Sequence, residues 1–427
     1  LSTDGLTFLL GAASSRAQGS VRNYFTPQRT GEVRVSATDV SDADVSALLP
    51  PNLIHPQGGT LAGVVSLIFD GNEALRTRGE VTLHRVQIDP LPKTLHPLRV
   101  EEGELKWEGH SGTFVITRGS VTGSTFHGQG QIRSFAPLNI EAALDFPVFE
   151  VESIFRLEER PPELEQKPKD KTVVVQVDVT AEQLTYKTFR ADRVRASCHW
   201  HGRQADIHVA GASTAGGHVQ GDAVLWPDVN ALFVTPRLTD VQASRLLTAF
   251  GISSDVLTGA FTGGGQIYMP DRHQWRSLAR WQAQLSLSIA DGVAQRVPIL
   301  VRLWTAVSLQ AVLRLQLPSL PNSGLAFSSL TGDFAIGGGL AVTKNLSLES
   351  SAVRLSADGE INLAERTVNL KTGLSPLHGI TSSVAKVPLA GQVIARGAEL
   401  LTTLPFRVSG PYDAPTVIPL VVDLGSR

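Results

Sequence analysis

The chain has very little cysteine and methionine, with Cys198 and Met269 as the single examples among 427 residues. One cysteine excludes an internal disulfide framework, and is compatible with the cytosol or with a periplasmic protein that avoids mispairing. Charged residues make up 18% of the chain and the net charge is −2, so nucleic acid is not expected as a partner. No uncharged apolar run reaches the roughly 18 residues of a transmembrane helix.

Glycine and proline, by contrast, are abundant, at 39 and 24 residues, and they separate short runs in which apolar and polar residues alternate. Such alternation predicts strands with one apolar face. Between residues 324 and 419 the predicted chain reversals fall at Asp358-Gly359 and at 364–366. The residues expected on the apolar face there, as the lining of a groove, are Leu346, Leu348, Val353, Leu355, Ile361, Leu363, Val368 and Leu370.

The same plan of strand, turn and strand recurs at 122–144, 214–234 and 350–372. Repeats that each expose an apolar face must stack or curl to bury it. The predicted fold is therefore mainly β: an elongated, curved antiparallel sheet forming a groove, with a few amphipathic helices near the C-terminal end. A closed sandwich, in which the same face is the core, is the alternative. The expected segments are strand repeats at 1–155, a charged Pro-rich linker at 156–171, further strand repeats at 172–245 and a C-terminal region at 246–427.

Helices are expected at a few places only. Residues 33–49 and 232–247 each place a strand before a short helix. Residues 297–317 predict a longer helix whose apolar surface must pack on the sheet or lie on a membrane. The apolar positions assigned to this cap or membrane helix are Leu300, Leu303, Trp304, Val307 and Val312.

Residues with catalytic or metal-binding chemistry form no recognisable set. In Cys198-His199-Trp200-His201 the two histidines would share one side of a strand, but no second ligand pair has suitable spacing. The glycine runs 263–265 and 337–339 lead into strands and not helices, so we interpret them as turns and not phosphate loops. We therefore expect no catalytic residues, no metal, no cofactor and no enzymatic activity.

The C-terminal region resembles the AsmA-like family of envelope proteins, the group that includes AsmA, TamB and YhdP. The matching segments are GDFAIGGGLAVTKNLSLES, ADGEINLAERTVNLK, KVPLAG and FRVSGPYDAPTV, in that order. The resemblance covers the chain from about residue 246 onward, and upstream it extends only to strand-rich repeats of similar texture.

The resemblance implies a bridge-like protein that carries phospholipid across the periplasm, between inner and outer membranes, in a hydrophobic β-groove. Its partners would be phospholipids, one or both membranes and other envelope proteins. The family usually has an N-terminal membrane helix, which is expected upstream of Leu1. Under this hypothesis, Leu355→Asp blocks transfer without unfolding the sheet. A periplasmic scaffold for outer-membrane protein assembly and an adhesin or glycan-binding solenoid are the alternatives.

Overall fold

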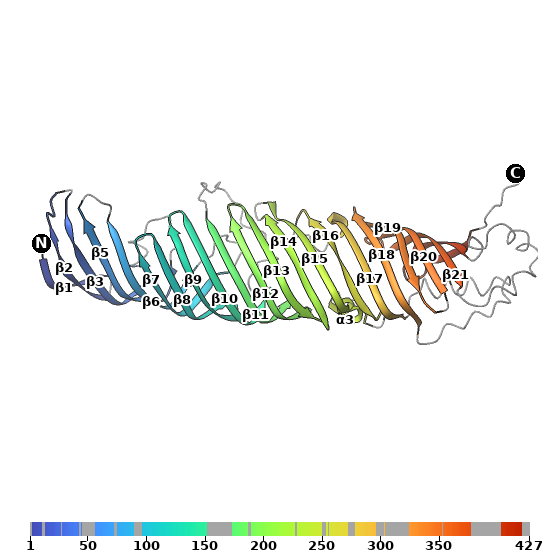
Figure 1. The fold of residues 1–427 in the computed structure, drawn as a ribbon, viewed down its shortest axis with the longest axis horizontal. Helices are drawn as coiled ribbons and strands as arrows, with labels where there is room; N and C mark the ends of the chain where they lie inside the picture. Colours follow the sequence, from blue (N-terminus) through green and yellow to red (C-terminus); the bar gives the residue numbers. More distant parts are fainter. Residues whose placement is uncertain are drawn as a thin grey trace, which may run out of the picture. The chain divides into compact units, whose positions relative to one another are not determined.

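The fold comes from a computed structural model of the chain (Figure 1). The residues that it describes are 2–10, 13–26, 28–41, 44, 56–71, 75–88, 96–151, 173–186, 189–226, 229–249, 253–254, 256–271, 278–295, 303, 324–351, 353–376 and 403–420. The chain divides into two compact units. The first contains 1–212 and 224–228, and the second contains 213–223 and 229–427.

The first unit is a sheet whose strands follow one another in chain order (Figure 1). Its strands are β1 (Ser2–Leu10), β2 (Ala13–Arg22), β3 (Thr30–Ser41), β4 (Pro56–Gln57), β5 (Thr60–Asp70), β6 (Arg76–Ile88), β7 (Leu98–Glu108), β8 (Ser111–Val121), β9 (Ser124–Phe135), β10 (Leu138–Glu150), β11 (Val174–Tyr186), β12 (Phe189–His201) and most of β13 (Gln204–Thr214). The departure from this order is β4, which pairs with β6 while β3 pairs directly with β5. The pairs from β1 to β12 are antiparallel apart from one.

The exception is the pair β10 and β11, which run parallel from Asn139 opposite Val174 to Glu150 opposite Thr185. A parallel pair cannot be joined by a tight turn, because the chain must return to the end at which the first strand began. The charged segment 156–171, predicted as a linker, falls between these strands and lies outside the described residues.

The second unit is a sheet of the same kind. Its strands are β15 (Ala231–Gln242), β16 (Ala260–Met269), β17 (Gln282–Ala294), β18 (Leu325–Gly337), β19 (Leu340–Glu349), β20 (Val353–Asn362), β21 (Thr367–Pro376), β22 (Leu404–Pro411) and β23 (Thr416–Pro419). All of these neighbours pair antiparallel. Strand β14 (Gly217–Trp226) contributes residues to both units.

Helix is scarce in the parts of the chain that the structure describes. The short helix predicted at the end of 232–247 is present as α3 (Ala243–Ala249), and a 3-10 turn, η3 (Leu278–Arg280), precedes β17. The predicted set of a few amphipathic helices near the C-terminal end is not confirmed by the described residues. The predicted helix 297–317 lies outside the described residues except for Leu303. The prediction of mainly β structure is confirmed.

Of the two predicted chain reversals between residues 324 and 419, one is right and one is wrong. Residues 364–366 do form the turn between β20 and β21, where Asn362 Oδ1 accepts hydrogen bonds from two backbone amides. The predicted reversal at Asp358-Gly359 is wrong, because both residues lie inside β20. A Cβ on Gly359 would collide with the backbone oxygen of Asn369 on the next strand. This glycine is therefore needed for close approach of two strands, the second common use of glycine in sheets.

Of the two glycine runs that the sequence analysis interprets as turns, one forms a turn and the other lies within a strand. Gly338 and Gly339 form the turn between β18 and β19, with φ of 62° and 81°. The run 263–265 lies in the middle of β16, so its interpretation as a turn is wrong. A Cβ on Gly265 would collide with the backbone oxygen of Gln284 across the sheet.

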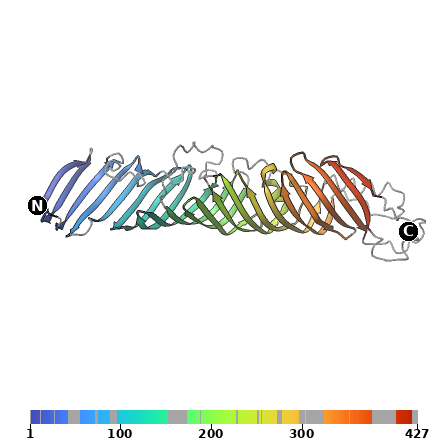
Figure 2. The same ribbon diagram turned by 90° about the horizontal axis from the view of Figure 1, so that it is seen from above.

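Several strands are kinked near the same end by a residue with left-handed backbone. In the first unit these residues are Asp39 in β3 (φ 56°), Arg85 in β6 (φ 55°) and Arg193 in β12 (φ 52°). In the second unit they are Asp240 in β15 (φ 55°) and Asp291 in β17 (φ 49°). We call this end of the strands the kinked end, and the opposite end of the same strands the hairpin end. Figure 2 shows the strands of each unit as curved ribbons.

Each kink resets the alternation of the strand. Val33 and Val35 face one side of β3, Thr38 and Asp39 are both exposed, and Val40 then returns to the buried side with 4% of its surface exposed. In a regular strand, an extra residue would move every later apolar side chain to the polar face. The left-handed residue takes up that extra position, so the later apolar side chains stay on the apolar face.

We expect Asp240→Val to destabilise the second unit. Asp240 lies where the register of β15 against β16 shifts, and its φ of 55° is costly for a β-branched residue. The loss should be about 1–3 kcal/mol in the free energy of unfolding, measured by urea denaturation. Asp240→Gly is the matched control and should be nearly neutral, and equal losses for both variants would contradict the strain argument.

Candidate functional site

The most extensive candidate site is the apolar face of the first sheet, which is formed by rows of side chains directly opposite one another on successive strands. The row nearest the hairpin end contains Val35, Val65, Gly79, Trp107, Gly112, Ile132, Ile140, Val175 and Trp200. The middle row contains Gly63, Val81, Leu105, Phe114, Gly130, Ala142, Val177 and Cys198. Each row crosses its strands without a charged residue.

Burial across this face is uneven. Every member of the middle row is half-buried, whereas alternate residues on the other face, such as Lys106 and Thr113, are exposed. Near the kinked end, by contrast, a cluster around Val121, Phe126 and Phe146 is buried, with 1–2% of each residue's surface exposed. A sheet face packed inside a sandwich would be buried throughout. The middle of this face is therefore an accessible apolar surface bordered by a closed core.

Large side chains lie over glycines on this face. The nearest atoms to a Cβ built on Gly79 belong to the ring of Trp107, whose Nε1 donates a hydrogen bond of 3.1 Å to Thr77 Oγ1. Phe114 lies in the same way over Gly130, and Phe126 over Gly119. Aromatic rings that cover cross-strand glycines compensate for the missing side chains and keep the surface low. The arrangement gives a smooth apolar surface, where interlocking ridges and pockets would give a rough one.

The second unit carries a similar row on its apolar face. It consists of Ile289, Leu330, Leu348, Leu355, Leu374 and Leu404, each opposite the next across six strands. Here the face is more buried, and Leu374 has 1% of its surface exposed. Val353, Val368 and Leu370 join the same cluster with 0–5% exposed.

The residues predicted to line a groove near the C-terminus mostly share this face. Leu348, Val353, Val368 and Leu370 are buried in the cluster, and Leu355 and Ile361 pack against it. Leu346 also lies on this face, half-buried opposite Ala357 and just after a shift in register. The remaining position lies elsewhere. Leu363 is half-buried beyond the end of β20, with its amide bound to the carbonyl of Gly339 at 2.8 Å.

Of the predicted cap or membrane helix, the structure describes one residue. Leu303 is buried in the cluster of the second unit, with 3% of its surface exposed. Leu300, Trp304, Val307 and Val312 lie outside the described residues, as does the KVPLAG segment.

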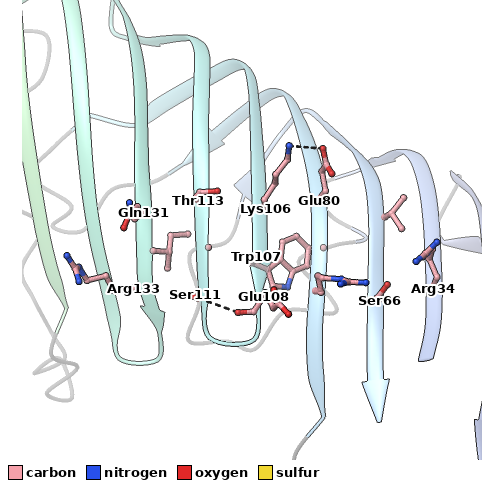
Figure 3. Close-up of a pocket in the computed structure, with 15 residues that line it drawn as sticks. Arg34, Ser66, Glu80, Lys106, Trp107, Glu108, Ser111, Thr113, Gln131 and Arg133 are labelled. Atoms are coloured by element: carbon pink, nitrogen blue, oxygen red, sulfur yellow. Dashed lines mark hydrogen bonds and ion pairs between the residues drawn. The ribbon is translucent and has the colours of Figure 1, made fainter. Parts of the chain in front are cut away.

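The opposite face of the first sheet is charged. Lys106 Nζ lies 3.1 Å from Glu80 Oε1 (Figure 3). It also lies 2.8 Å from Glu104 Oε1, and the carboxylates of Glu104 and Glu80 raise the pKa of Lys106. A hollow of about 850 Å³ is lined mainly by this face, including Arg34 and Gln131. Its ion pairs are exposed, which is typical of a solvated sheet surface.

The sequence Cys198-His199-Trp200-His201 is split between the two faces. Cys198 and Trp200 belong to the apolar rows, and burial raises the pKa of the Cys198 thiol, which disfavours a nucleophilic thiolate. The histidine rings do share the other face, as predicted, with centroids 6.2 Å apart. His201 Nδ1 lies 3.5 Å from Asp206 Oδ2, but no group of three metal-ligating side chains occurs within the described ranges.

One exposed ion pair predicts an acid-sensitive contribution to stability. Arg133 Nε and Nη2 donate to Glu141 Oε1 and Oε2 at 2.6 and 2.8 Å, and these bonds lower the pKa of Glu141 below its ordinary value of 4.5. Because the folded pKa is the lower one, the contribution is complete above the ordinary value and is lost as pH falls through the folded pKa. Glu141→Gln should therefore flatten the loss of stability below about pH 4.5, measured by urea denaturation at several pH values. An unchanged acid profile would contradict the assignment.

Sequence reasoning singled out the second unit and missed the lining of the first. The signal was present in the segment 103–116, where Leu105, Trp107, Phe114 and Ile116 alternate with polar residues or face glycines. Alternation alone does not identify the partner strands, so the rows became visible only once the register was known.

Within the described ranges, none of the helices has the length and hydrophobicity of a membrane span.

Comparison with known proteins assigns the family. No curated protein and no solved structure matches the chain. The family model described as YhdP protein matches residues 121–417, and therefore begins well upstream of the region in which the resemblance was detected. The chain belongs to the YhdP family, a member of the AsmA-like group of envelope proteins.

Proposed function

We propose that the chain is part of a bridge-like protein that carries phospholipid across the periplasm, between the inner and outer membranes, along its apolar sheet faces. The observation that carries the proposal is the accessible, uncharged middle row of the first unit, from Gly63 to Cys198. Family membership supports an envelope role, and residence in the periplasm with an anchor in the inner membrane is part of the proposal.

The physical basis is the hydrophobic effect. Each methylene exposed to water costs about 0.8 kcal/mol, so an acyl chain leaving a bilayer needs continuous apolar contact. A row of half-buried aliphatic and aromatic side chains offers that contact without a tight pocket. Because neighbouring positions in the row are chemically alike, a lipid can shift along them with little change in free energy. We propose that transfer involves no covalent chemistry.

The test is mass spectrometry of an organic extract of the purified chain. We expect phospholipid in stoichiometric amounts, in excess over a control protein purified from the same cells. The alternative, a scaffold for outer-membrane protein assembly, predicts no bound phospholipid and co-purification with an outer-membrane protein. A lipid-free extract from a folded preparation would refute the proposal.

The position used to test the groove should be in the first unit. Leu355 lies between Leu348 and Leu374, which have 6% and 1% of their surfaces exposed. Leu355 is itself half-buried but packs against the closed cluster of the second unit, so an aspartate there would place a carboxylate against buried apolar side chains, which destabilises the fold. Leu355→Asp therefore confuses loss of transfer with loss of folding. Leu105 separates the two effects better, because its cross-strand neighbours Val81 and Phe114 are half-buried as well.

A further inference from the structure

Tryptophan and tyrosine are distributed unevenly between the two ends of the strands in the first unit. Tyr24, Trp107, Trp200 and Trp226 lie at the hairpin end, in the turns or within two residues of a strand end, whereas Tyr186 is the described example at the kinked end. Trp107 and Trp200 belong to the apolar row nearest the hairpin end. In the second unit, Trp281 and Tyr412 also flank strand ends on the hairpin side.

The kinked end of the first unit has a different composition on the same face. Its buried cluster consists of Val121, Phe126, Phe146, Ala181, Ala191, Val194 and Ala212, none of which has a polar side-chain atom. Crossing the face from the hairpin end to the kinked end, the lining changes from tryptophans with an N–H group to a mainly hydrocarbon cluster, beside which the hydroxyl group of Ser124 is buried. Tryptophan and tyrosine favour boundaries between polar and apolar surroundings, and they gather at the head-group level of membranes for that reason.

The balance of charged residues also differs between the hairpin end and the kinked end of the first unit. Among the described residues of the turns and the two residues at each strand end, the hairpin end of the first unit contains Arg22, Arg29, Arg76 and Arg203 against Asp70 and Glu108. The described residues at the kinked end include Arg99 and Arg190 against Asp44 and Glu150. Within this described set, the excess of arginine lies on the side with the tryptophans, where it complements an anionic phosphate.

We infer that a phospholipid lies across the apolar face of the first unit in a fixed orientation, with its phosphate at the hairpin end, at the level of the row that contains Trp107 and Trp200, and its acyl chains directed toward the kinked end, where the Phe126 cluster lies. This inference rests on the proposed function and adds the direction in which the lipid is held. Trp107 is well placed to mark the boundary, because its ring lies over Gly79 and its position is fixed by the hydrogen bond from Nε1 to Thr77 Oγ1.

Fluorescence of single tryptophans tests the orientation. One variant keeps Trp107 and replaces the other five tryptophans by phenylalanine. A second variant replaces Trp107 as well and introduces Phe189→Trp, at a half-buried position beside the cluster at the kinked end. Each protein is loaded with phosphatidylglycerol carrying a nitroxide either near the glycerol or at the methyl end of an acyl chain. Circular dichroism confirms that both variants are folded, and lipid phosphorus gives the amount bound.

We expect Trp107 to lose more fluorescence to the label near the glycerol, and the tryptophan at position 189 to lose more to the label at the methyl end. The same order at both positions, or the reverse order, would overturn the orientation while leaving lipid binding intact. Absence of bound lipid in folded protein would instead refute the proposed function. Should Phe189→Trp prevent folding, Leu184→Trp gives a second half-buried probe of the same cluster.

Discussion

Leu105→Asp is expected to abolish lipid transfer while the sheet stays folded. Leu105 lies in the middle row of the first unit, opposite Val81 and Phe114, and it is half-buried. In the lipid-free protein the new carboxylate retains part of its hydration, so folding should tolerate it. An acyl chain crossing this position would remove that water, and burying an unpaired polar group costs at least about 2 kcal/mol. Transfer between donor and acceptor vesicles should therefore fall by roughly tenfold or more.

Two matched variants make this result specific. Thr113→Asp places the same charge on the other face of β8, exposed and opposite Lys106, and should leave transfer unchanged. Leu105→Ala keeps the lining uncharged and should retain most of the activity. Normal transfer by Leu105→Asp, with the urea midpoint of the native protein, would contradict the use of this face as the lipid path.

Gly119→Ala is expected to destabilise the first unit by overpacking its buried aromatic cluster. The nearest atoms to a Cβ at this position belong to the ring of Phe126, which has 1% of its surface exposed and contacts Phe146 with ring centroids 5.3 Å apart. The ring has no free space into which it can move, so the cost should reach the 1–3 kcal/mol that is typical of overpacking. Urea denaturation measures this loss.

A double-mutant cycle identifies the cause. Phe126→Leu alone should also destabilise the protein, but it removes the ring with which the new methyl group collides. Gly119→Ala and Phe126→Leu together should therefore cost less than the sum of the two single losses. Gly211→Ala is the control, since a Cβ there would meet no atom within 4 Å. Additive losses would show that the ring is not the obstacle.

How far the sequence predicts this structure depends on which physical signal was used. Alternation between Val353 and Leu370 correctly placed most of those residues on one face, because the period of a strand is two residues. Glycine was ambiguous: at Gly339 it forms a turn, whereas at Gly359 it admits the backbone of the next strand. A single sequence cannot separate these two uses, because the second depends on a partner strand.

The candidate site shows the same limit. The parallel pairing of β10 with β11 has no local signature in either strand. The kinks do have one, as pairs of exposed residues such as Thr38-Asp39 and Thr239-Asp240 interrupt the alternation just before a buried valine. These residue pairs can be seen in the sequence, but only the left-handed φ in the structure shows that the apolar face continues past them.

Pairing between neighbours in the chain has a consequence for how such a protein is made. In the second unit every strand from β15 to β23 finds its partners in the strands immediately before and after it. Such an architecture is nearly one-dimensional, so each hairpin can dock as soon as it emerges, without waiting for distant sequence. Addition or loss of a whole hairpin would change the reach of the sheet without altering any other pairing. Under the proposed function, length is thus a property that selection can adjust to the distance that the lipid path must cover.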